Sequence, residues 1–576
     1  MAKDKRVLVI GLDGFEISLA EAMMRRGDLP NLQALKERSA RFLLDHGEAK
    51  YSGLAWEHVS TGLTPEAIDR HAAVSFDSQT YTMRQDPTSN APFFSAVKSK
   101  AVVFDLPYCD LDKAEGLKGV TAWGAHDPGV KPHSRPAGLH EELAQRFGPY
   151  PAPEFIYGFT WPSARKTEEA GAALCRAVLK RRDCAIWLLK ERLPDWNLAM
   201  VVVSEAHSGL EILWHGVDRD HPLHEIPSAE PARKAVCDLY HAIDILVGDL
   251  AAAFSDAEIV TFSMHGMGTN DADVPSMVLL PELMYRRSFG KPYMRAGRWR
   301  LEAGGKLAML DDKQNWGGEM YRTIPKLAEF KDVQGVLDEP FAYDPARAER
   351  LEWMPTLRYR PFWPKMDAFA IPAFYDGQIR LNMAGREAAG MVPHDRYRAK
   401  LDEIERFLAD CRDIATGKPA IADIVRTTSN PSAIGPTQAD IRIRWSGCPL
   451  GLQHPQAGTI GPVPMRRTGG HSGPYGFVYF AGDRWQKGDG GIRNSFDVVP
   501  TVLAGLGEAE ALKIVSGSPV DAKLGPEGER RGLPGEGDEV LTAATRYALE
   551  TPDISRADMR PRPSLVSRLF GRRLSA

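Results

Sequence analysis

The sequence lacks the cysteine spacing of a disulfide framework or a zinc knuckle. Its six cysteines are scattered through 576 residues, and no two of them form a Cys-x-x-Cys pair. Both of those classes depend on cysteines at characteristic spacings. The scattered thiols fit reduced residues in a cytoplasm better, and we therefore expect a cytoplasmic protein.

Long hydrophobic runs and an excess of one charge are missing as well. The first apolar run, residues 7–11, is too short for the core of a signal peptide, and Asp13 interrupts it. No run reaches the roughly 18 apolar residues of a membrane span. The 72 basic and 76 acidic residues give a net charge of −4, which is not the footprint of a nucleic-acid binder. We expect neither a membrane span nor a nucleic-acid partner.

Short apolar segments alternate along the chain with segments of helical periodicity. This alternation predicts an α/β fold with a mainly parallel sheet. The predicted strands are residues 7–11, 101–105, 198–203, 258–262 and 477–481, and the predicted longer helices are residues 17–39, 168–191, 231–254, 395–414 and 495–506.

Polar residues that can bind a metal follow four of the predicted strands. Asp13, Asp110, His207 and His265 each lie at or just beyond a strand end. Ligands bind beyond the carboxyl ends of strands in open parallel sheets, so residues far apart in sequence can converge there. Each residue alone also has a simpler interpretation. His265, for example, could be a core histidine with satisfied hydrogen bonds.

Glu211 and His471 extend this set. Glu211 lies four residues after His207, which places both side chains on one face if a helix begins there. His471 lies in the run Thr468-Gly-Gly-His-Ser-Gly, whose glycines let the backbone approach an ion closely. Taken singly, His207 and Glu211 could form a surface pair and His471 could serve a turn. Together, the strand-end and glycine-rich positions favour a metal site.

Ser52 is the candidate nucleophile. It precedes a short segment of apolar periodicity, where the N-cap of a helix is expected. A helix N-terminus presents free N–H groups and favours anions, so a hydroxyl held there can meet a phosphoryl or sulfuryl group. The simpler interpretation is that Ser52 only caps the helix.

These motifs, in this order, resemble the alkaline phosphatase superfamily and its type I phosphodiesterase / nucleotide pyrophosphatase branch, over about residues 6 to 507. Val-Ile-Gly-Leu-Asp13-Gly resembles the family's opening metal-aspartate strand, and Ser52 stands where the family keeps its nucleophile. The resemblance implies a three-layer sandwich with a mainly parallel central sheet and a cap subdomain. The further matches are Leu29-Pro-Asn-Leu, Trp56, Thr121-Ala-Trp-Gly-Ala-His126-Asp-Pro, Trp214-His215, Asp220-His-Pro, Asn382-Met-Ala-Gly-Arg386, Gly470-His471 and Asp497-Val-Val-Pro500-Thr.

One departure from the family pattern concerns the first metal. The usual Asp-x-x-x-His appears here as His207-Ser-Gly-Leu-Glu211, so the nitrogen and oxygen ligands have exchanged places. With His471, this set still offers two imidazoles and one carboxylate. That combination suits a catalytic zinc ion, with manganese or iron as alternatives.

A second departure concerns the other metal. Met264 stands where the family has an aspartate, which leaves only Asp13, His265 and the Ser52 oxygen for a second ion. A thioether suits soft ions and not those of phosphoryl transfer. We therefore expect one ion to be more secure than two.

The resemblance implies a metal-dependent hydrolase or transferase of small phosphate esters, with diesters first, that works through a covalent Ser52 intermediate. It places His126 and Trp56 at the substrate site. Arg466 and Arg467 could grip a substrate anion, or they could be solvated loop residues. The alternatives are a catalytically silent ligand-binding protein of the same fold and a group transferase whose acceptor is not water.

We expect three parts in the chain. Residues 1–270 and 420–510 would form the catalytic core, residues 271–419 an insertion or cap with a small α/β subdomain, and residues 511–576 a C-terminal extension. The arginine-rich end is expected to be a solvated tail, with weak contact to an anionic membrane surface as the alternative. The sequence leaves the oligomeric state open.

Overall fold

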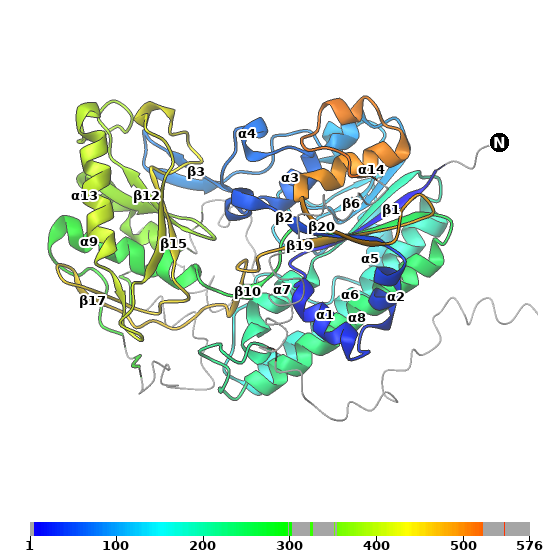
Figure 1. Cartoon of the computed structure of the whole chain (residues 1–576), viewed down its shortest axis with the longest axis horizontal. Helices are drawn as coiled ribbons and strands as arrows, with labels where there is room; N and C mark the ends of the chain where they lie inside the picture. The colour runs from blue at the N-terminus through cyan, green and yellow to red at the C-terminus, as the bar shows by residue number, and fades with distance from the viewer. Residues whose placement is uncertain are drawn as a thin grey trace, which may run out of the picture.

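Two lobes, each built on its own β-sheet, make up the described part of the chain (Figure 1). The computed structural model describes residues 5–297, 299–301, 323–325, 351, 354–521 and 547. The main lobe contains a nine-stranded sheet in the order β20-β2-β19-β9-β1-β8-β5-β6-β7. The second lobe contains a four-stranded sheet in the order β11-β12-β15-β14.

The main sheet is mostly parallel, as the sequence predicts. Strand β1 pairs in parallel with β8 and β9, and β5 pairs in parallel with β8 and β6. Strand β19 runs antiparallel to both of its neighbours, β9 and β2. The strands are β1 (Val7–Leu12), β2 (Ala40–Asp45), β5 (Ala101–Phe104), β6 (Lys118–Thr121), β7 (His133–Arg135), β8 (Leu198–Val203), β9 (Glu258–Ser263), β19 (Gly476–Ala481) and β20 (Gly488–Asn494).

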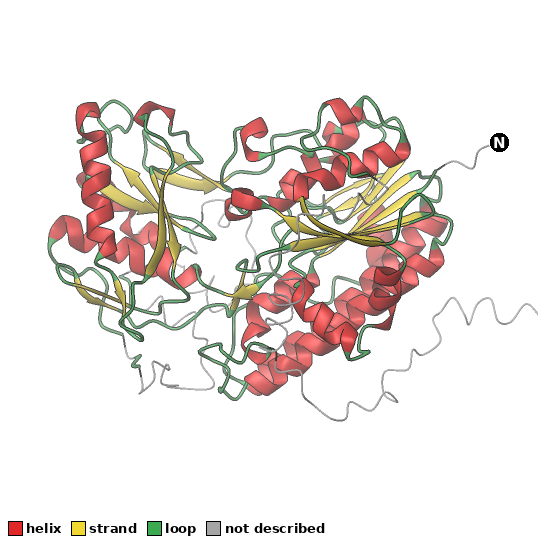
Figure 2. Ribbon diagram, viewed as in Figure 1, coloured by secondary structure: helices red, strands yellow, loops and turns green. Residues whose placement is uncertain are grey.

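Helices cover both faces of this sheet and give three layers (Figure 2). Every residue of β1 and β8 is buried, because apolar side chains leave both faces of each strand. One apolar cluster lies under α1, α2 and α5 to α8, and another lies under α3 and α14. The helices are α1 (Ile17–Arg25), α2 (Pro30–Glu37), α3 (Ala55–Thr61), α4 (Pro65–Ile68), α5 (Leu139–Phe147), α6 (Ala164–Trp187), α7 (Glu205–Leu213), α8 (Ala229–Ala253) and α14 (Val498–Leu506).

The parallel register brings three chain segments to one edge of the sheet. Leu12 at the end of β1 lies opposite Val203 at the end of β8, and Gly11 lies opposite Phe262 in β9. The residues that follow these strands therefore emerge side by side. This edge receives Asp13, the start of α7 and His265.

The second lobe gathers segments from several parts of the chain. Residues 421–445, which the sequence analysis assigns to the core, contain β14 and β15 and pair here with β12. The hairpin β3–β4 also contributes side chains to this lobe's apolar cluster. The division into domains stays a prediction. The elements are β3 (Val74–Asp77), β4 (Thr82–Gln85), α9 (Leu280–Phe289), β11 (Ala368–Ile371), β12 (Gly377–Leu381), α13 (Tyr397–Ala409), β13 (Arg412–Asp413), β14 (Ile421–Arg426), β15 (Ile441–Trp445), β16 (Leu452–His454) and β17 (Gly458–Ile460).

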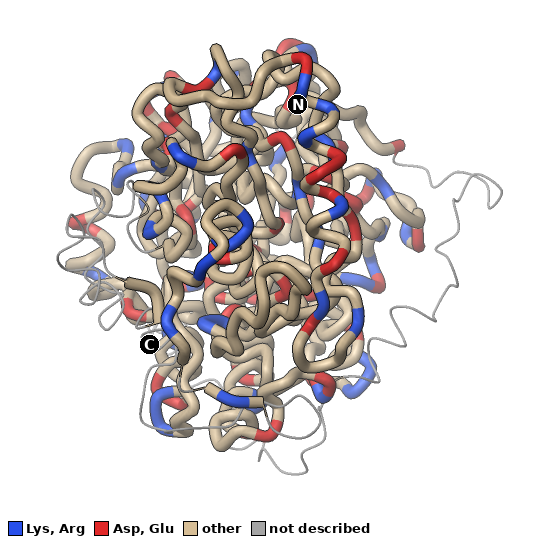
Figure 3. Tube along the Cα trace, turned by 90° about the vertical axis from the view of Figure 1, so that its left-hand side faces the viewer, with Lys and Arg blue, Asp and Glu red and all other residues tan. Residues whose placement is uncertain are grey.

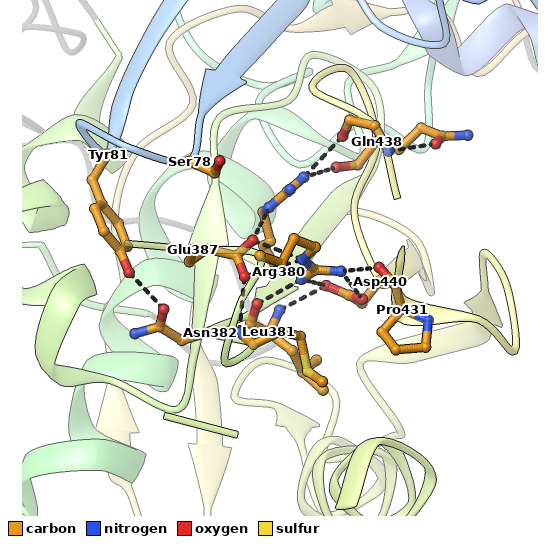
Figure 4. A network of polar contacts seen from close by, with 12 residues as sticks. Ser78, Tyr81, Arg380, Leu381, Asn382, Glu387, Pro431, Gln438 and Asp440 are labelled. Carbon is orange, nitrogen blue, oxygen red and sulfur yellow. Dashed lines mark hydrogen bonds and ion pairs between the residues drawn. The ribbon is translucent and has the colours of Figure 1, made fainter. Parts of the chain in front are cut away.

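A buried polar network holds the centre of the second lobe (Figure 4). Arg380 pairs with Glu387 at 2.8 Å, and Arg386 pairs with Asp440 at 2.8 Å. The Tyr81 hydroxyl of the β3–β4 hairpin donates to Asn382 Oδ1 at 2.6 Å. The Asn382–Arg386 motif, noted in the sequence for its family resemblance, therefore acts here as a structural tie between the hairpin and the sheet.

Acidic and basic residues are interspersed along the Cα trace in Figure 3, in keeping with their near balance in the sequence. Among the residues that the structure describes, no helix is both long and apolar enough to cross a membrane. The aromatic residues Trp316 and Trp353 of the expected cap, and the arginine-rich end at 556–576, lie outside the described residues.

Candidate metal centre

Helix α7 carries the first two candidate ligands. Their placement on one face depends on a helix at this point of the chain, and the structure has one. It begins directly after β8, and its first turn lies at the carboxyl edge of the main sheet. His207 and Glu211, one helical turn apart, are both buried, with Nε2 and Oε1 3.7 Å apart. The spacing of the two residues on one helical face is what allows this approach.

A buried ion-pair triad fixes the start of α7. The guanidinium of Arg181 in α6 contacts Glu205 at 2.8 Å and Asp105 at 2.7 Å, and all three side chains are fully buried. Asp105 also accepts hydrogen bonds from the backbone N–H groups of Trp123 and Gly124. The carboxylate at the end of β5 is therefore a structural anchor. Asp110, which the sequence analysis singles out, lies farther along the chain, where it caps a short 3₁₀ helix.

Asp13 orients His207. The Nδ1 and Oδ2 atoms of the two residues lie 3.0 Å apart. Burial by itself would raise the pKa of Asp13, but the charge of His207 and its hydrogen bond lower it below its usual value. Gly14 makes this approach feasible, because a Cβ atom there would lie 2.9 Å from the Cα of His207. In the neutral form of His207 that a metal requires, this contact places the ring hydrogen on Nδ1, and Nε2 then has a lone pair on the side of Glu211.

His126 joins the same group, although the sequence analysis assigns it to the substrate site. Its Nε2 lies 3.2 Å from Glu211 Oε2, and its ring centroid lies 4.0 Å from that of His207. Its Nδ1 lies 3.3 Å from Asp127. Burial would lower the pKa of His126, but Asp127 and Glu211 together raise it to about 10. The ligand atoms of His126, His207 and Glu211 all lie within 4.8 Å of one another.

The two candidate arginines have different partners. Arg467 donates from Nη1 to Glu211 Oε1 at 2.5 Å. Burial would raise the pKa of Glu211, but Arg467 and then His126 hold it well below its usual range. Arg466 instead pairs with Asp273 at 2.8 Å. Arg467 is thus in contact with the metal-type group, whereas a substrate contact for either arginine stays a prediction.

His265 and His471 complete the cluster of imidazoles. The ring centroid of His471 lies 4.6 Å from that of His207 and 4.4 Å from that of His265. The antiparallel pair β10 (Gly268–Thr269) and β18 (Gly469–Gly470) ties the two histidine loops together. A Cβ atom at Gly473 would lie 2.3 Å from Gly266, so the loops approach at glycines. Burial lowers the pKa of His265 to about 4 and that of His471 well below its usual value.

Ser52 does not cap α3, contrary to the sequence analysis. It ends the 3₁₀ helix of residues Gly47–Ser52, and Leu54 occupies the N-cap position without a side-chain bond. The Ser52 hydroxyl donates to the Ala49 carbonyl at 2.7 Å and accepts from the Leu54 N–H at 3.1 Å. Gly53 lies between the two helices and has a φ of 72°, a left-handed backbone conformation that glycine adopts easily. The chain turns at this residue, so Ser52 is not part of α3.

Met264 and Trp56 lie in the apolar layer behind the cluster. Met264 belongs to the buried apolar cluster that also contains Leu54 and Trp56. The Trp56 ring fills the space at Gly11, where a Cβ atom would lie 2.5 Å from the ring. A hydrogen bond from Trp56 also contributes to the lowered pKa of Asp13. Its predicted contact with substrate stays a prediction.

The donor atoms fit a metal ion on two observations. His207 Nε2 and His471 Nδ1 are buried without a hydrogen-bond partner, and such orphaned nitrogens need a ligand. Glu211 supplies an ionised carboxylate beside His207. Two imidazoles and a carboxylate form the donor set of a catalytic zinc site. Among the described residues, the groups with metal-type spacing are His126, His207 and Glu211, which are all buried, and Asp110, Asp112 and His133, which are exposed or partly exposed.

Comparisons with protein-family models and with curated protein sequences find no match. Among solved structures, phosphonoacetate hydrolase from Sinorhizobium meliloti 1021, in complex with phosphonoformate, is similar at 14% identity and a TM-score of 0.42, over 88% of this chain and 96% of that chain. Human ectonucleotide pyrophosphatase / phosphodiesterase 5 is similar at 11% identity and a TM-score of 0.40, over 87% and 95%. An inactive murine form of the same protein, in complex with AMP, gives 11% and 0.37, over 89% and 100%.

At such identities and TM-scores, the likeness carries no weight in assigning the function. The assignment below rests on the residues of the site.

Proposed function

We propose that the protein is a metal-dependent hydrolase of small phosphate esters, with diesters as the first class, acting through a covalent Ser52 intermediate. The observation that supports it is the buried convergence of Asp13, His207, Glu211, His265 and His471, with unpartnered nitrogens on His207 and His471. A purely structural core would leave few such nitrogens unsatisfied.

His207, Glu211 and His471 would hold the ion, with zinc first and manganese or iron as alternatives. When bound, such an ion polarises a phosphoryl oxygen and neutralises developing charge. Asp13 sets the tautomer of His207, and Arg467 keeps Glu211 ionised. His126 is a further candidate ligand. Its raised pKa means that, without an ion, the ring is protonated at neutral pH. Metal uptake at His126 would therefore release a proton.

Ser52 supplies the nucleophile. Its Oγ forms the bond to phosphorus while the ester P–O bond breaks and the alcohol leaves with a proton. Water then cleaves the serine–phosphate bond and returns a proton to Oγ. The hydrogen bond from Oγ to the Ala49 carbonyl has to break before attack.

Lys50 supplies positive charge two residues before Ser52. Its ammonium makes no ion pair or hydrogen bond with any residue that the structure describes, and the side chain is half-buried. Its charge contributes to the lowered pKa values of His46 and His265. Because Met264 cannot help a second ion to bind, Lys50 is a group that can take over part of that ion's charge near the nucleophile.

The test is turnover of aryl phosphodiesters by protein loaded with Zn²⁺ or Mn²⁺, compared with Ser52→Ala. We expect Ser52→Ala to abolish turnover. Ser60→Ala is the matched control, because Ser60 in α3 also has a buried hydroxyl bonded to a backbone carbonyl, that of Tyr108. Absence of serine-dependent turnover on every phosphate, phosphonate and sulfate ester would contradict the proposal.

Two alternatives have their own support. The apolar surroundings of Met264 and the backbone bonds of Ser52 are features that a silent ligand-binding protein could keep. Metal analysis separates this case, because a silent protein need not bind an ion stoichiometrically. A group transferase would use the same Ser52 intermediate, and product analysis with alcohol acceptors would distinguish it from hydrolysis.

A further inference from the structure

Tyr375 of the second lobe reaches the candidate site of the main lobe. It lies in the loop between β11 and β12, next to Phe374. Its ring meets the ring of His471 edge to face, with centroids 4.1 Å apart and planes at 76°. The second lobe therefore contributes a side chain that touches a candidate metal ligand.

The same ring also touches the segment of the candidate nucleophile. A Cβ atom built at Gly53 would lie 3.2 Å from Tyr375 Cε2 and 3.4 Å from Phe374 Cδ2. Gly53 directly follows Ser52, so Tyr375 stands between the nucleophile segment and His471. A ligand that contacts both Ser52 and the metal-type group would lie against this ring.

An ion pair between the lobes holds the Ser52 segment close to the second sheet. Glu48, in the 3₁₀ helix that ends at Ser52, pairs with Arg442 at 3.3 Å and also with Arg444, both in β15. The guanidinium of Arg444 lies 4.9 Å from the centroid of the Tyr51 ring. These contacts hold the segment that contains Ser52 against the lobe that carries Tyr375.

The Tyr375 hydroxyl is a donor without an acceptor. It makes no hydrogen bond with any residue that the structure describes. A phenol keeps its proton at neutral pH, and the carboxylates that act on it are those of Asp127, Glu211 and Asp13. Those carboxylates are already engaged, because they pair with His126, Arg467 and His207 respectively. Tyr375 is only partly buried, so a bound ligand can supply the acceptor in place of water.

We propose that Tyr375 is a substrate-contacting residue whose hydroxyl donates a hydrogen bond to a phosphoryl oxygen of the ester held between Ser52 and His471. This inference rests on the proposed function. In this proposal, side chains from both lobes form the substrate site. A donor aimed at an anion contributes more than a neutral pair, because the acceptor is charged.

The experiment compares Tyr375→Phe, which removes only the hydroxyl, with Tyr375→Leu, which also removes the ring. Calorimetry on zinc-loaded protein measures the Kd of inorganic phosphate, and steady-state kinetics measure kcat and KM for an aryl phosphodiester. We expect Tyr375→Phe to weaken phosphate binding and kcat/KM by about 10- to 100-fold, in the range of hydrogen bonds to charged groups.

Tyr285→Phe is the matched control. Tyr285 belongs to the same lobe but lies in α9, where its ring packs against Phe289 and Tyr293. We expect this variant to bind phosphate as the wild-type protein does. Thermal unfolding of each variant shows whether Tyr375→Leu remains folded.

The outcomes separate this inference from the proposed function. Phosphate binding that is equal in wild type and Tyr375→Phe, or absent from the wild-type protein, overturns the inference. Binding that depends on Tyr375 without turnover of any ester upholds the contact and overturns the hydrolase. Serine-dependent turnover with no effect of Tyr375→Phe upholds the hydrolase and overturns the contact.

Discussion

Asp13 and His207 are hydrogen-bonded at 3.0 Å although 194 positions separate them in the chain. Their contact joins the loop after β1 to helix α7, and Gly14 provides the necessary room. The bond leaves His207 Nε2 facing Glu211 as a free lone pair. Partners of this kind fix the tautomer and raise the basicity of a metal-binding histidine.

Asp13→Ala should therefore weaken zinc binding. We expect a loss of about 10- to 100-fold in affinity, the usual effect of removing a carboxylate that orients a ligating histidine. Asp13→Asn, which keeps an oxygen acceptor, should lose less. Competition with a chromogenic chelator measures both. Equal zinc affinity in Asp13→Ala and wild type would show that His207 does not depend on this bond.

Substitution of the ligands themselves should remove the ion. His207→Ala and Glu211→Gln should each lower the zinc bound per chain from about one to near zero, as measured by elemental analysis after dialysis, because each removes one of few donors. His133→Ala is the control, since His133 belongs to the separate exposed group with Asp110 and Asp112. Loss of zinc from His133→Ala alone would move the site to that group.

The variant Met264→Asp tests whether the apolar side chain at position 264 is the reason that a second ion does not bind well. In the metal-free protein, a carboxylate in this apolar layer should lower the free energy of unfolding by roughly 3–5 kcal/mol, because it is buried without a partner. Added zinc should restore part of that loss, since the new carboxylate would directly precede His265 in the chain. Urea denaturation with and without zinc measures the difference.

Met264→Leu is the matched control for this experiment. It keeps the volume and apolar character of the site, so we expect a loss below about 1.5 kcal/mol and no dependence on zinc. A loss in Met264→Asp that zinc does not change would mean that the new carboxylate faces away from any ion.

Asp376, next to Tyr375, should make stability depend on pH. Burial raises its pKa from 3.8 to about 7, against the opposing charges of Arg442 and Arg444, while Gln378 donates to it at 3.0 Å and the charge of Glu48 adds to the rise. The unfolded carboxyl ionises near pH 4, whereas the folded one stays protonated up to about pH 7. The stabilisation is therefore present below pH 4 and is lost as pH rises to about 7.

The loss over this window should reach ~4 kcal/mol at about 1.4 kcal/mol per pKa unit. Asp376→Asn keeps the oxygen that accepts from Gln378 and cannot ionise. It should flatten the pH dependence of the unfolding free energy between pH 4 and 8, measured by urea denaturation. A variant with the same pH profile as the wild type would assign the dependence to other groups.

The features predicted well from the sequence depend on local pattern. The apolar run at 198–203 predicted a strand, and the spacing of His207 and Glu211 places both candidate ligands on one face if a helix follows. The structure has β8 and α7 there. Parallel strands then bring Asp13 and His265 to the same edge. This convergence follows from the topology of a parallel sheet, which hydrophobic patterning can predict.

The features that were missed depend on packing between distant segments. Ser52 was expected to cap a helix, but Gly53 turns the chain first and α3 begins at Ala55. The contact of His126 with Glu211 spans 85 positions, and no local spacing signals it. Tyr375 carries no motif at all, because its role arises only where the two lobes meet.

The hairpin β3–β4 limits how the two lobes can be taken apart. It precedes most of the main sheet in sequence, yet Phe76 and Tyr81 pack with Phe369 of the second lobe. A truncated protein without the later segments of the second lobe would expose these aromatic rings to solvent. An exposed apolar patch of this kind promotes aggregation. Each lobe depends on chain segments that lie within the sequence of the other, so the two lobes have to be engineered as a single unit.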